Sequence, residues 1–364
     1  MNICFIAGAS TIHTVRWVNA MANKGHEVSL ITQHKEELNS FETNVDVYEL
    51  PIKNNSGYYL NYPVAKYYIN KIKPDIINTH YASGYGTLSR LINFTPTLLS
   101  VWGSDVYDFP NQSDIKKDIL KKNLAAATEI ASTSHVMKKQ TERFVNGKEI
   151  HITPFGIDLE KFSPDKYKKN LNMMNIGIVK KLAPKYGIEY LIRSFAILVN
   201  EKNILDKTNK KIKLTIVGKG EQRSYLEELA KELEIAELTD FVGVIPYNEV
   251  PDYLNTFDIF CAPSTLDSES FGVAIIEASA CELPVVVSDV GGLPEVVDNG
   301  ETGYVVPSKD PEALADKLYE LIFDQDKRKL MGKKGREKVE QLYDWGKNVD
   351  KMEEIYQEMI KKYK

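Results

Sequence analysis

The feature of this 364-residue chain that most constrains its fold is a repeated alternation of short apolar runs with longer amphipathic runs. The short runs have the length of buried strands, and the longer ones have the spacing of helices that cover a sheet. The alternation predicts βαβ units, a parallel sheet and helices on both of its faces. We expect strands at 3–6, 28–32, 45–50, 75–78, 97–101, 129–132 and 149–153, and again at 175–179, 213–217, 239–242, 259–262, 284–288 and 303–306.

The alternation stops once, at a segment that contains two prolines and a glycine. This segment, Pro154–Pro164, is followed by the Lys-rich stretch 166–172. Such composition is typical of a linker between domains. We therefore expect an α/β fold of two Rossmann-like domains, 1–163 and 164–344. Helices are expected at 14–22, 188–199, 222–234, 250–256, 273–281, 293–298, 311–323 and 345–364.

Charge and cysteine content exclude several classes of protein. With a formal net charge of −5, the chain lacks the broad basic surface of a general nucleic-acid binder. A local basic pocket that binds a small anion stays an alternative. Cys4, Cys261 and Cys281 are too few and too scattered for a disulfide framework or a zinc site. The start resembles no signal peptide, and no run approaches the ~18 apolar residues of a membrane span. We expect a cytoplasmic protein, with peripheral attachment to the inner face of the membrane left open.

Two glutamates follow a predicted strand of the second half. Glu269 stands on a polar loop and Glu277 lies in the next helix, with Phe271 and Gly272 between them. A glycine at this point lets a ligand approach the backbone, and carboxylate oxygens accept hydrogen bonds from sugar or ribose hydroxyls. The alternative is a capping Glu followed by a solvent-facing Glu. Glu277 lies among apolar residues, however, so it requires a partner.

The spacing of Glu269-Ser-Phe-Gly and Glu277 resembles the paired-glutamate motif of the family 4 glycosyltransferases, which have the GT-B fold. Other segments resemble that family in the same order along nearly the whole chain. They are the helix-to-strand turn 24–28, the interdomain segment 154–164, the glycine turn 217–221 and the late loop 290–295.

The resemblance implies two Rossmann-like domains that face each other across a cleft, with the last helix, 345–364, packed back on the first domain. It implies transfer of a sugar from a nucleotide diphosphate sugar, which we expect to be a UDP-sugar, to a hydroxyl of a lipid-linked or polysaccharide-type acceptor. Retention of anomeric configuration, no metal and no cofactor are also implied. The sequence has no Asp-x-Asp triad and no His/Cys cluster. The donor-binding residues implied are Gly8, Gly218, Ser264, Phe271, Gly272 and Glu277.

Three lysines follow the first predicted strand of the second half. Lys180, Lys181 and Lys185 could stabilise the negative charge that a diphosphate leaving group develops. The family usually has an Arg and a Lys here, whereas this chain has no Arg. Lys180 keeps the spacing to Lys185, and Lys181 aligns better by the Leu that follows it, so both stay open. With Glu269 and His80 these lysines are the candidate catalytic residues. The alternative interpretation is a solvated lysine run.

The first predicted strand is followed by a loop that contains Gly8 and Ser10. A loop that leads from a strand into a helix can bind an anion, but the pattern is not Gly-x-Gly-x-x-Gly, which disfavours NAD. His80 ends a later strand, where it could bind a sugar hydroxyl or shuttle a proton. We assign the acceptor to Ser10, His13, Arg16 and Asp105. The alternatives are a tight turn, a structural histidine and, for Asp105, a cap on the next turn.

A lysine cluster at 116–122 is expected to form a solvated helix face, or to meet anionic lipid headgroups. The oligomeric state is not predicted. Two other functions stay open: a UDP-sugar epimerase with the same fold, and a non-catalytic protein that binds nucleotide sugars. A phosphorylase would need a pyridoxal lysine and a longer chain. Mutation of Glu269 would abolish turnover in an enzyme and only binding in a binding protein.

Overall fold

The chain divides into two compact units in a computed structural model that describes residues 1–34, 41–165, 169–170 and 172–364. Unit 1 comprises Met1–Phe155 and Gly346–Lys364, and unit 2 comprises Gly156–Trp345. The division at Phe155 lies inside the segment that the sequence predicts as a linker. Residues 166–168 and 171 of the Lys-rich stretch lie outside the described residues.

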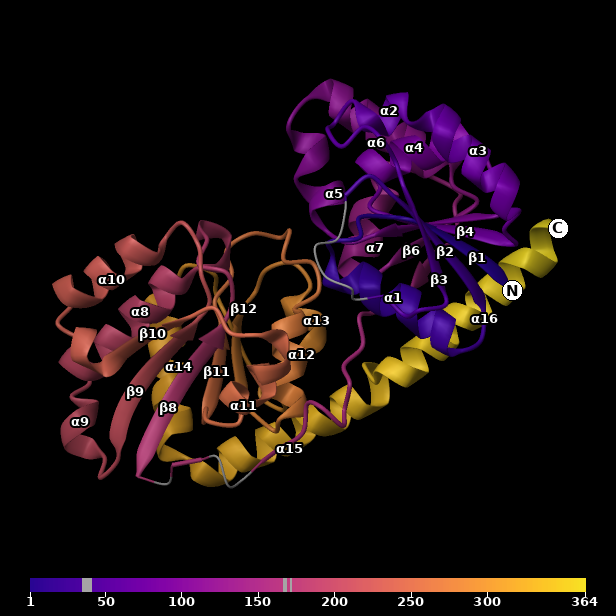
Figure 1. Cartoon of the computed structure of the whole chain (residues 1–364). Coiled ribbons are helices and arrows are strands. Elements are labelled where there is room, and N and C mark those ends of the chain that lie inside the picture. Colours follow the sequence, from indigo (N-terminus) through magenta and orange to yellow (C-terminus); the bar gives the residue numbers. More distant parts are fainter. Residues whose placement is uncertain (35–40, 166–168, 171) are drawn as a thin grey trace. The chain divides into compact units, whose positions relative to one another are not determined.

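Unit 1 is built on a seven-stranded sheet in the order β3-β2-β1-β4-β5-β6-β7, and each pair of neighbouring strands is parallel. The central strands read as continuous apolar runs because helices cover both faces (Figure 1). All seven predicted strands of the first half are present. They are β1 Asn2–Ile6, β2 Glu27–Thr32, β3 Val45–Glu49, β4 Ile76–His80, β5 Thr97–Val101, β6 Glu129–Ser132 and β7 Ile150–Ile152.

Two helices of unit 1, α6 and α7, begin at a serine that caps them. The hydroxyl of Ser113 accepts from the backbone N–H of Lys116 at the start of α6, and Ser134 accepts in the same way from Met137 at the start of α7. Apolar residues of β1, β2 and β4 pack with those of α3 and α4. The helices are α1 Ile12–Asn23, α2 Gly57–Leu60, α3 Tyr62–Ile72, α4 Gly84–Ile92, α5 Ser104–Tyr107, α6 Asp114–Ala126, α7 His135–Glu142 and α16 Trp345–Tyr363.

The last helix, α16, belongs to unit 1 from Gly346 onward and packs along it as an amphipathic rod (Figure 1). Its Tyr356 is fully buried and accepts a hydrogen bond from the Asn78 amide of β4. The Glu353 carboxylate lies 2.7 Å from Nε2 of His26 and 2.6 Å from Nζ of Lys24. Near its end, Lys362 is paired with Glu129 at 2.7 Å. The helix is therefore fixed to unit 1 by a buried core residue and by ion pairs near its middle and near its C-terminal end.

Unit 2 repeats the architecture with a six-stranded parallel sheet in the order β10-β9-β8-β11-β12-β13. The six predicted strands of the second half are all present. They are β8 Met173–Val179, β9 Lys211–Val217, β10 Thr239–Gly243, β11 Ile259–Ala262, β12 Val285–Ser288 and β13 Gly303–Val306. Its core lies between the sheet and α8, α10 and α14.

The helices of unit 2 follow the prediction except in three places. The short helix α9, Ile204–Lys207, has no counterpart among the predicted helices. The helix expected at 188–199 is α-helical only to Ala196 and continues as a π-helix, Ile197–Glu201. The sequence prediction also missed α15, because two of its buried positions are glycines that give no apolar signal. The α-helices are α8 Ile188–Ala196, α9 Ile204–Lys207, α10 Arg223–Glu232, α11 Val250–Leu254, α12 Val273–Ala280, α13 Leu293–Val296, α14 Pro311–Phe323 and α15 Gln325–Leu342.

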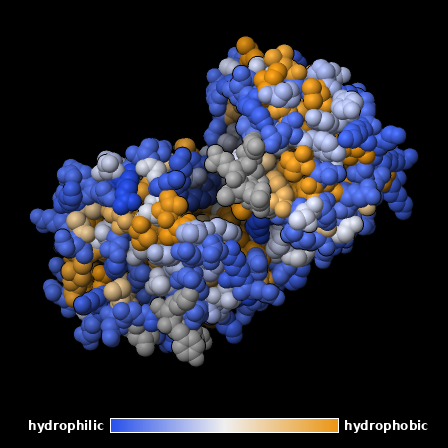
Figure 2. Space-filling model, viewed as in Figure 1, coloured by the Kyte–Doolittle hydropathy of each residue, from blue (hydrophilic) through white to orange (hydrophobic). Residues whose placement is uncertain are grey.

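Hydrophilic residues cover most of the face that Figure 2 shows, and smaller hydrophobic patches interrupt them on each unit. Among the described residues, no helix combines the length and the apolar character that crossing a membrane would require. All three cysteines are free and buried, and burial raises the pKa of each thiol. The thiols therefore serve as small apolar core groups.

Candidate active site

The residues of the candidate site in unit 2 come from loops at one edge of its sheet. The loops after β8, β9, β10 and β11 all leave the carboxyl ends of parallel strands, which lie at the same edge. Ligands of open α/β sheets bind at this edge. The three candidate lysines follow β8, Gly218 follows β9, and Ser264 and Glu269 follow β11.

Lys180 and Glu269 form an ion pair at this edge. The Lys180 Nζ lies 2.7 Å from Oε1 of Glu269, and their side chains are 21% and 10% exposed. Burial alone would lower the pKa of Lys180, but the charge of Glu269 and the hydrogen bond to it outweigh burial and raise that pKa. Lys180 is therefore a protonated cation in a largely desolvated place, where it acts more strongly on an anion than a solvated lysine does.

Lys181 and Lys185 have different surroundings. The Lys181 side chain is 64% exposed, and its Nζ lies 3.8 Å from Glu221 on the surface. Lys185 is half-buried in the short 3₁₀ turn Pro184–Tyr186, and its carbonyl accepts a 2.8 Å hydrogen bond from the backbone N–H of Thr265. The structure thus brings Lys180 together with Glu269, places Lys185 beside the loop that follows β11, and turns Lys181 outward.

Glu277 lies in α12 with only 6% of its surface exposed. The Tyr247 hydroxyl donates to its Oε1 at 2.8 Å. A buried carboxylate requires such a partner, as its apolar neighbours in the sequence predict. Tyr247 is a residue that the sequence analysis missed. Its position just after β10, at the binding edge of the sheet, is the signal that could have found it.

Several glycines let the backbones of these loops touch. Gly218 has a φ of +141°, and a Cβ there would lie 1.9 Å from the carbonyl oxygen of Lys180. The late loop makes a similar contact, because a Cβ on Gly292 would lie 2.1 Å from the carbonyl oxygen of Ser270. The Gly292 N–H donates to the backbone carbonyl of Glu269. Gly272, with a φ of +95°, starts α12. These glycines fix the Lys180 and Glu269 loops by close packing.

Two hollows of unit 2 adjoin Lys180. The larger, about 720 Å³, is lined by Lys181, the glycine turn 218–220 and the residues after β10, including Tyr247. The smaller, about 10 Å³, is lined by Lys180, Tyr186, Ser264, Glu269 and Gly272, among others. Lys180 lines both hollows. It therefore stands between a space that fits a nucleoside and the loop that carries Glu269.

Unit 1 has a pocket of about 250 Å³ at the carboxyl edge of its own sheet. The predicted residues Gly8, Ser10 and His80 line it. The other rings of this pocket come from loops that are distant in the sequence, and no sequence motif points to them. They are His34, Tyr58, Tyr81, Tyr85 and Trp102.

His80 is 1% exposed, and its Nδ1 lies 3.1 Å from the hydroxyl of Thr14. Burial, with a smaller contribution from His13, lowers the pKa of His80 to about 3. Burial and the charge of Lys53 also lower the pKa of His34. His80 is thus neutral near pH 7 and can bind a hydroxyl, but it does not titrate in the physiological range.

The other predicted acceptor residues of unit 1 do not line this pocket. His13 stacks on Phe155 with ring centroids 3.9 Å apart, and Arg16 lies in α1. The Asp105 carboxylate accepts from the backbone N–H groups of Ala82, Trp102 and Gly103, and burial raises its pKa. The Asp105 carboxylate therefore binds three backbone N–H groups of neighbouring loops but makes no cap hydrogen bond to α5, and acceptor contact by His13, Arg16 and Asp105 stays a prediction.

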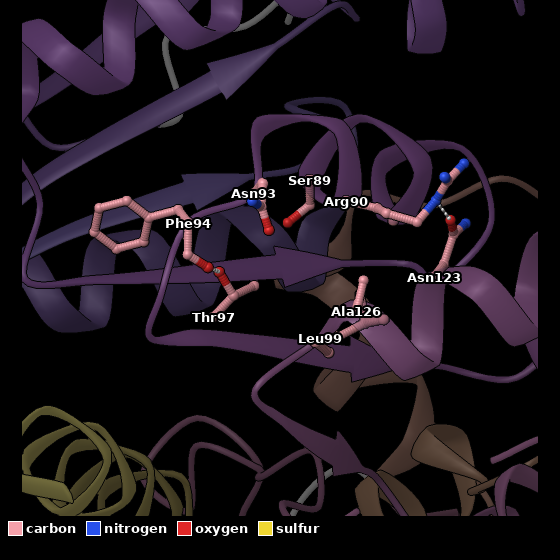
Figure 3. Close-up of a pocket in the computed structure, with 10 residues that line it drawn as sticks. Ser89, Arg90, Asn93, Phe94, Thr97, Leu99, Asn123 and Ala126 are labelled. Atoms are coloured by element: carbon pink, nitrogen blue, oxygen red, sulfur yellow. Dashed lines mark hydrogen bonds between the residues drawn. The ribbon is translucent and has the colours of Figure 1, made fainter. Parts of the chain in front are cut away.

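Unit 1 contains a further small hollow and a cluster of acidic and histidine side chains. The hollow in Figure 3, between α4, β5 and α6, is about 10 Å³, enough for one water, and Arg90 donates across it to Asn123 at 2.9 Å. Glu129, Glu149 and His151 form the one cluster among the described residues with metal-ligand spacing. Lys362 is paired with both of its carboxylates, so an ammonium already neutralises this cluster.

Comparison with protein families gives two matches that cover most of the chain. The model "Glycosyl transferases group 1" matches residues 160–338, and "Glycosyl transferase 4-like" matches residues 2–134. The first match contains Lys180, Lys185, Glu269 and Glu277, and the second contains His80.

Individual relatives agree with these matches. The capsular polysaccharide biosynthesis glycosyltransferase CapM of Staphylococcus aureus is 27% identical over 94% of this chain and 93% of its own. A GDP-mannose-dependent α-(1-6)-phosphatidylinositol monomannoside mannosyltransferase of Mycolicibacterium smegmatis is 31% identical over 54% of this chain and 52% of its own. The crystal structure of Anabaena HepE in complex with UDP has a TM-score of 0.82, with 17% identity, over 98% of this chain and 100% of that one. The last likeness concerns the fold.

Proposed function

From the premise that this chain belongs to the group 1 glycosyltransferases of family 4 and has their GT-B fold, we propose that it transfers a glycosyl unit from a UDP-sugar, with retention and without a metal. The observation that carries the proposal is the arrangement around Lys180. The half-buried ammonium of Lys180, paired at 2.7 Å with the buried carboxylate of Glu269, stands between the larger hollow and the loop that would face the sugar.

The donor is assigned to unit 2. Glu277 accepts hydrogen bonds from the ribose hydroxyls, and the large hollow beside Gly218 takes the base and ribose. The diphosphate lies against Lys180 and Lys185. Glu269, with the Phe271-Gly272 backbone, binds the hydroxyls of the sugar, because a carboxylate supplies acceptors and the start of α12 supplies N–H donors.

The reaction requires stabilisation of the leaving group. The bond between the anomeric carbon and the phosphate oxygen breaks, and its electron pair stays on the diphosphate beside Lys180 and Lys185. The acceptor oxygen bonds to the anomeric carbon on the same face, and its proton passes to the departing phosphate oxygen. Preorganised cations stabilise this charge more in the transition state than in the ground state.

The acceptor is assigned to the pocket of unit 1. Its described lining consists of hydroxyls, backbone and aromatic rings, and it contains His80 and His34, whose lowered pKa values keep both neutral. Neutral rings and hydroxyls suit a sugar hydroxyl of a polysaccharide-type or lipid-linked acceptor. Attachment to a membrane through the lysine face of α6 also stays a proposal.

Proton NMR of the reaction tests this function. The full chain is incubated with UDP-glucose, UDP-N-acetylglucosamine or GDP-mannose, with octyl glucoside or phosphatidylinositol vesicles as acceptor. We expect a UDP-sugar to be consumed as one new anomeric signal appears, with the donor's configuration. An inverted linkage contradicts the retaining mechanism. Consumption of GDP-mannose alone contradicts the assignment of a UDP-sugar as donor. Conversion of the donor in the absence of an acceptor favours the epimerase. Glu269→Gln is expected to abolish turnover, and Glu228→Gln, an exposed glutamate of α10, is the control.

A further inference from the structure

Two of the three candidate lysines share one aromatic ring. The Lys180 Nζ lies 4.6 Å from the centroid of the Tyr186 ring, and the Lys185 Nζ lies 5.0 Å from the same centroid. Both distances are within the ~6 Å over which an ammonium is attracted to the face of a ring. Lys181 makes no such contact among the described residues, and its ammonium lies 3.8 Å from Glu221 instead.

The Tyr186 ring offsets the electrostatic repulsion between the two ammonium groups. Because both ammonium groups lie within 5.0 Å of one centroid, their separation is at most about one Debye length at 0.1 M salt, ~10 Å, and they repel each other. Glu269 neutralises Lys180 on one side. The negative face of Tyr186 is the second group that favours the two charged lysines together, before any anion is present.

The fold holds this ring in place. Tyr186 ends the 3₁₀ turn that begins at Pro184, and Gly187 follows it with a φ of +62°. A Cβ on Gly187 would lie 1.9 Å from the carbonyl oxygen of Pro263, so the turn is packed directly on the loop that leads to Glu269. Tyr186 also packs against the core of unit 2 and lines the small hollow with Lys180 and Glu269. The ring is therefore a rigid support for two flexible side chains.

We propose that Tyr186 is a positioning residue, whose aromatic face gathers the ammonium groups of Lys180 and Lys185 so that both meet the diphosphate of the donor. The inference rests on the proposed function, because it takes the diphosphate as the ligand of these lysines. The face of the ring carries this role and the hydroxyl does not. A phenylalanine at position 186 should therefore preserve the binding of the diphosphate, whereas an aliphatic side chain of similar bulk should not.

Titration calorimetry with UDP, and with uridine as the probe that lacks phosphates, tests the proposal on the full chain. Tyr186→Leu is expected to weaken UDP binding by about 5- to 30-fold, the effect of two lost cation–π contacts, and to leave uridine binding unchanged. Tyr186→Phe is expected to stay within about 2-fold of the parent for both ligands. Tyr225→Leu, which removes a ring that contacts Glu189 and neither of these two lysines, is the control.

The outcomes separate this inference from the function on which it rests. Parent-like UDP binding by Tyr186→Leu overturns the inference, as does an equal loss for UDP and uridine, which would mean a packing role only. Lys185→Ala is measured in the same series. If Lys185→Ala does not weaken UDP binding relative to uridine binding, the proposed binding site of the diphosphate is wrong. If Lys185→Ala weakens UDP binding and Tyr186→Leu does not, only the role proposed for Tyr186 is wrong. Tyr186→Met replaces the leucine variant if that variant does not fold.

Discussion

At the scale of single residues, the structure distinguishes two adjacent lysines that the sequence leaves equivalent. Lys180 is paired with a buried carboxylate, and Lys181 extends into solvent toward Glu221. We expect Lys180→Ala and Lys185→Ala each to lower kcat by about 100- to 1000-fold, with a smaller effect on KM, because the lost charge acts mainly in the transition state. Lys181→Ala should change kcat by no more than about 3-fold, since an exposed pair contributes little. Equal losses at Lys180 and Lys181, measured by steady-state release of nucleotide, would contradict this assignment.

His80 carries a second prediction at this scale, on pH and stability. Its pKa is lowered to about 3 in the folded chain. Between that value and the unfolded pKa of ~6.5, the unfolded chain binds a proton at His80 and the folded chain does not. The stability that depends on neutral His80 is complete above the unfolded pKa of ~6.5 and is lost as the pH falls below it. We expect a loss of about 2 kcal/mol between pH 6.5 and pH 5.

The test compares melting temperatures at pH 7 and pH 5. The drop on acidification should be smaller in His80→Gln than in the parent, while His135→Asn, at an exposed histidine of unit 1, should keep the parent's drop. Equal drops in all three chains would show that His80 takes up its proton without a cost to folding. The same low pKa predicts that the activity profile near pH 6–7 does not report His80.

At the scale of elements, α15 offers a matched pair of glycines. A Cβ on Gly332 would lie 2.1 Å from the carbonyl oxygen of Glu282, whereas a Cβ on Gly335 would find its nearest neighbour, the Ser279 side chain, at 3.4 Å. Gly332→Ala should therefore destabilise unit 2 by about 1–3 kcal/mol through overpacking. Gly335→Ala should be neutral or stabilising by up to ~1 kcal/mol, because alanine is the better helix former. Thermal melts in which Gly332→Ala and Gly335→Ala lower the melting temperature equally would contradict this packing of α15.

The same helix shows which elements a sequence pattern can reveal. Strands such as β12, with Val285–Val287 all buried, have continuous apolar runs and are predicted directly. The contact of α15 with its neighbour needs small residues, so Gly332 and Gly335 remove the apolar periodicity that would reveal it. The π-helical end of α8 is missed for a related reason, because its residues, Ile197–Glu201, keep a helical composition while the hydrogen-bonding pattern changes.

At the scale of the whole molecule, the order of strands and helices is predictable because both sheets are parallel and buried. The motif residues are also predictable, because they follow strand ends and match a family. Partners that come from elsewhere in the chain are not. Tyr247 lies 30 residues before Glu277, and the rings of the unit 1 pocket come from separate loops, so only the fold brings them together.

Calorimetric titration of UDP into the parent and into Glu277→Gln tests whether unit 2 binds a nucleoside diphosphate through Glu277 and the lysines after β8. Gln keeps only one acceptor oxygen, so the ribose hydroxyls and Tyr247 compete for it. We expect one UDP to bind per chain and Glu277→Gln to weaken that binding by about 10-fold or more, the cost of a lost hydrogen bond to a charged group. Unchanged UDP affinity in Glu277→Gln, with a parent-like melting temperature, would show that Glu277 does not bind the nucleotide.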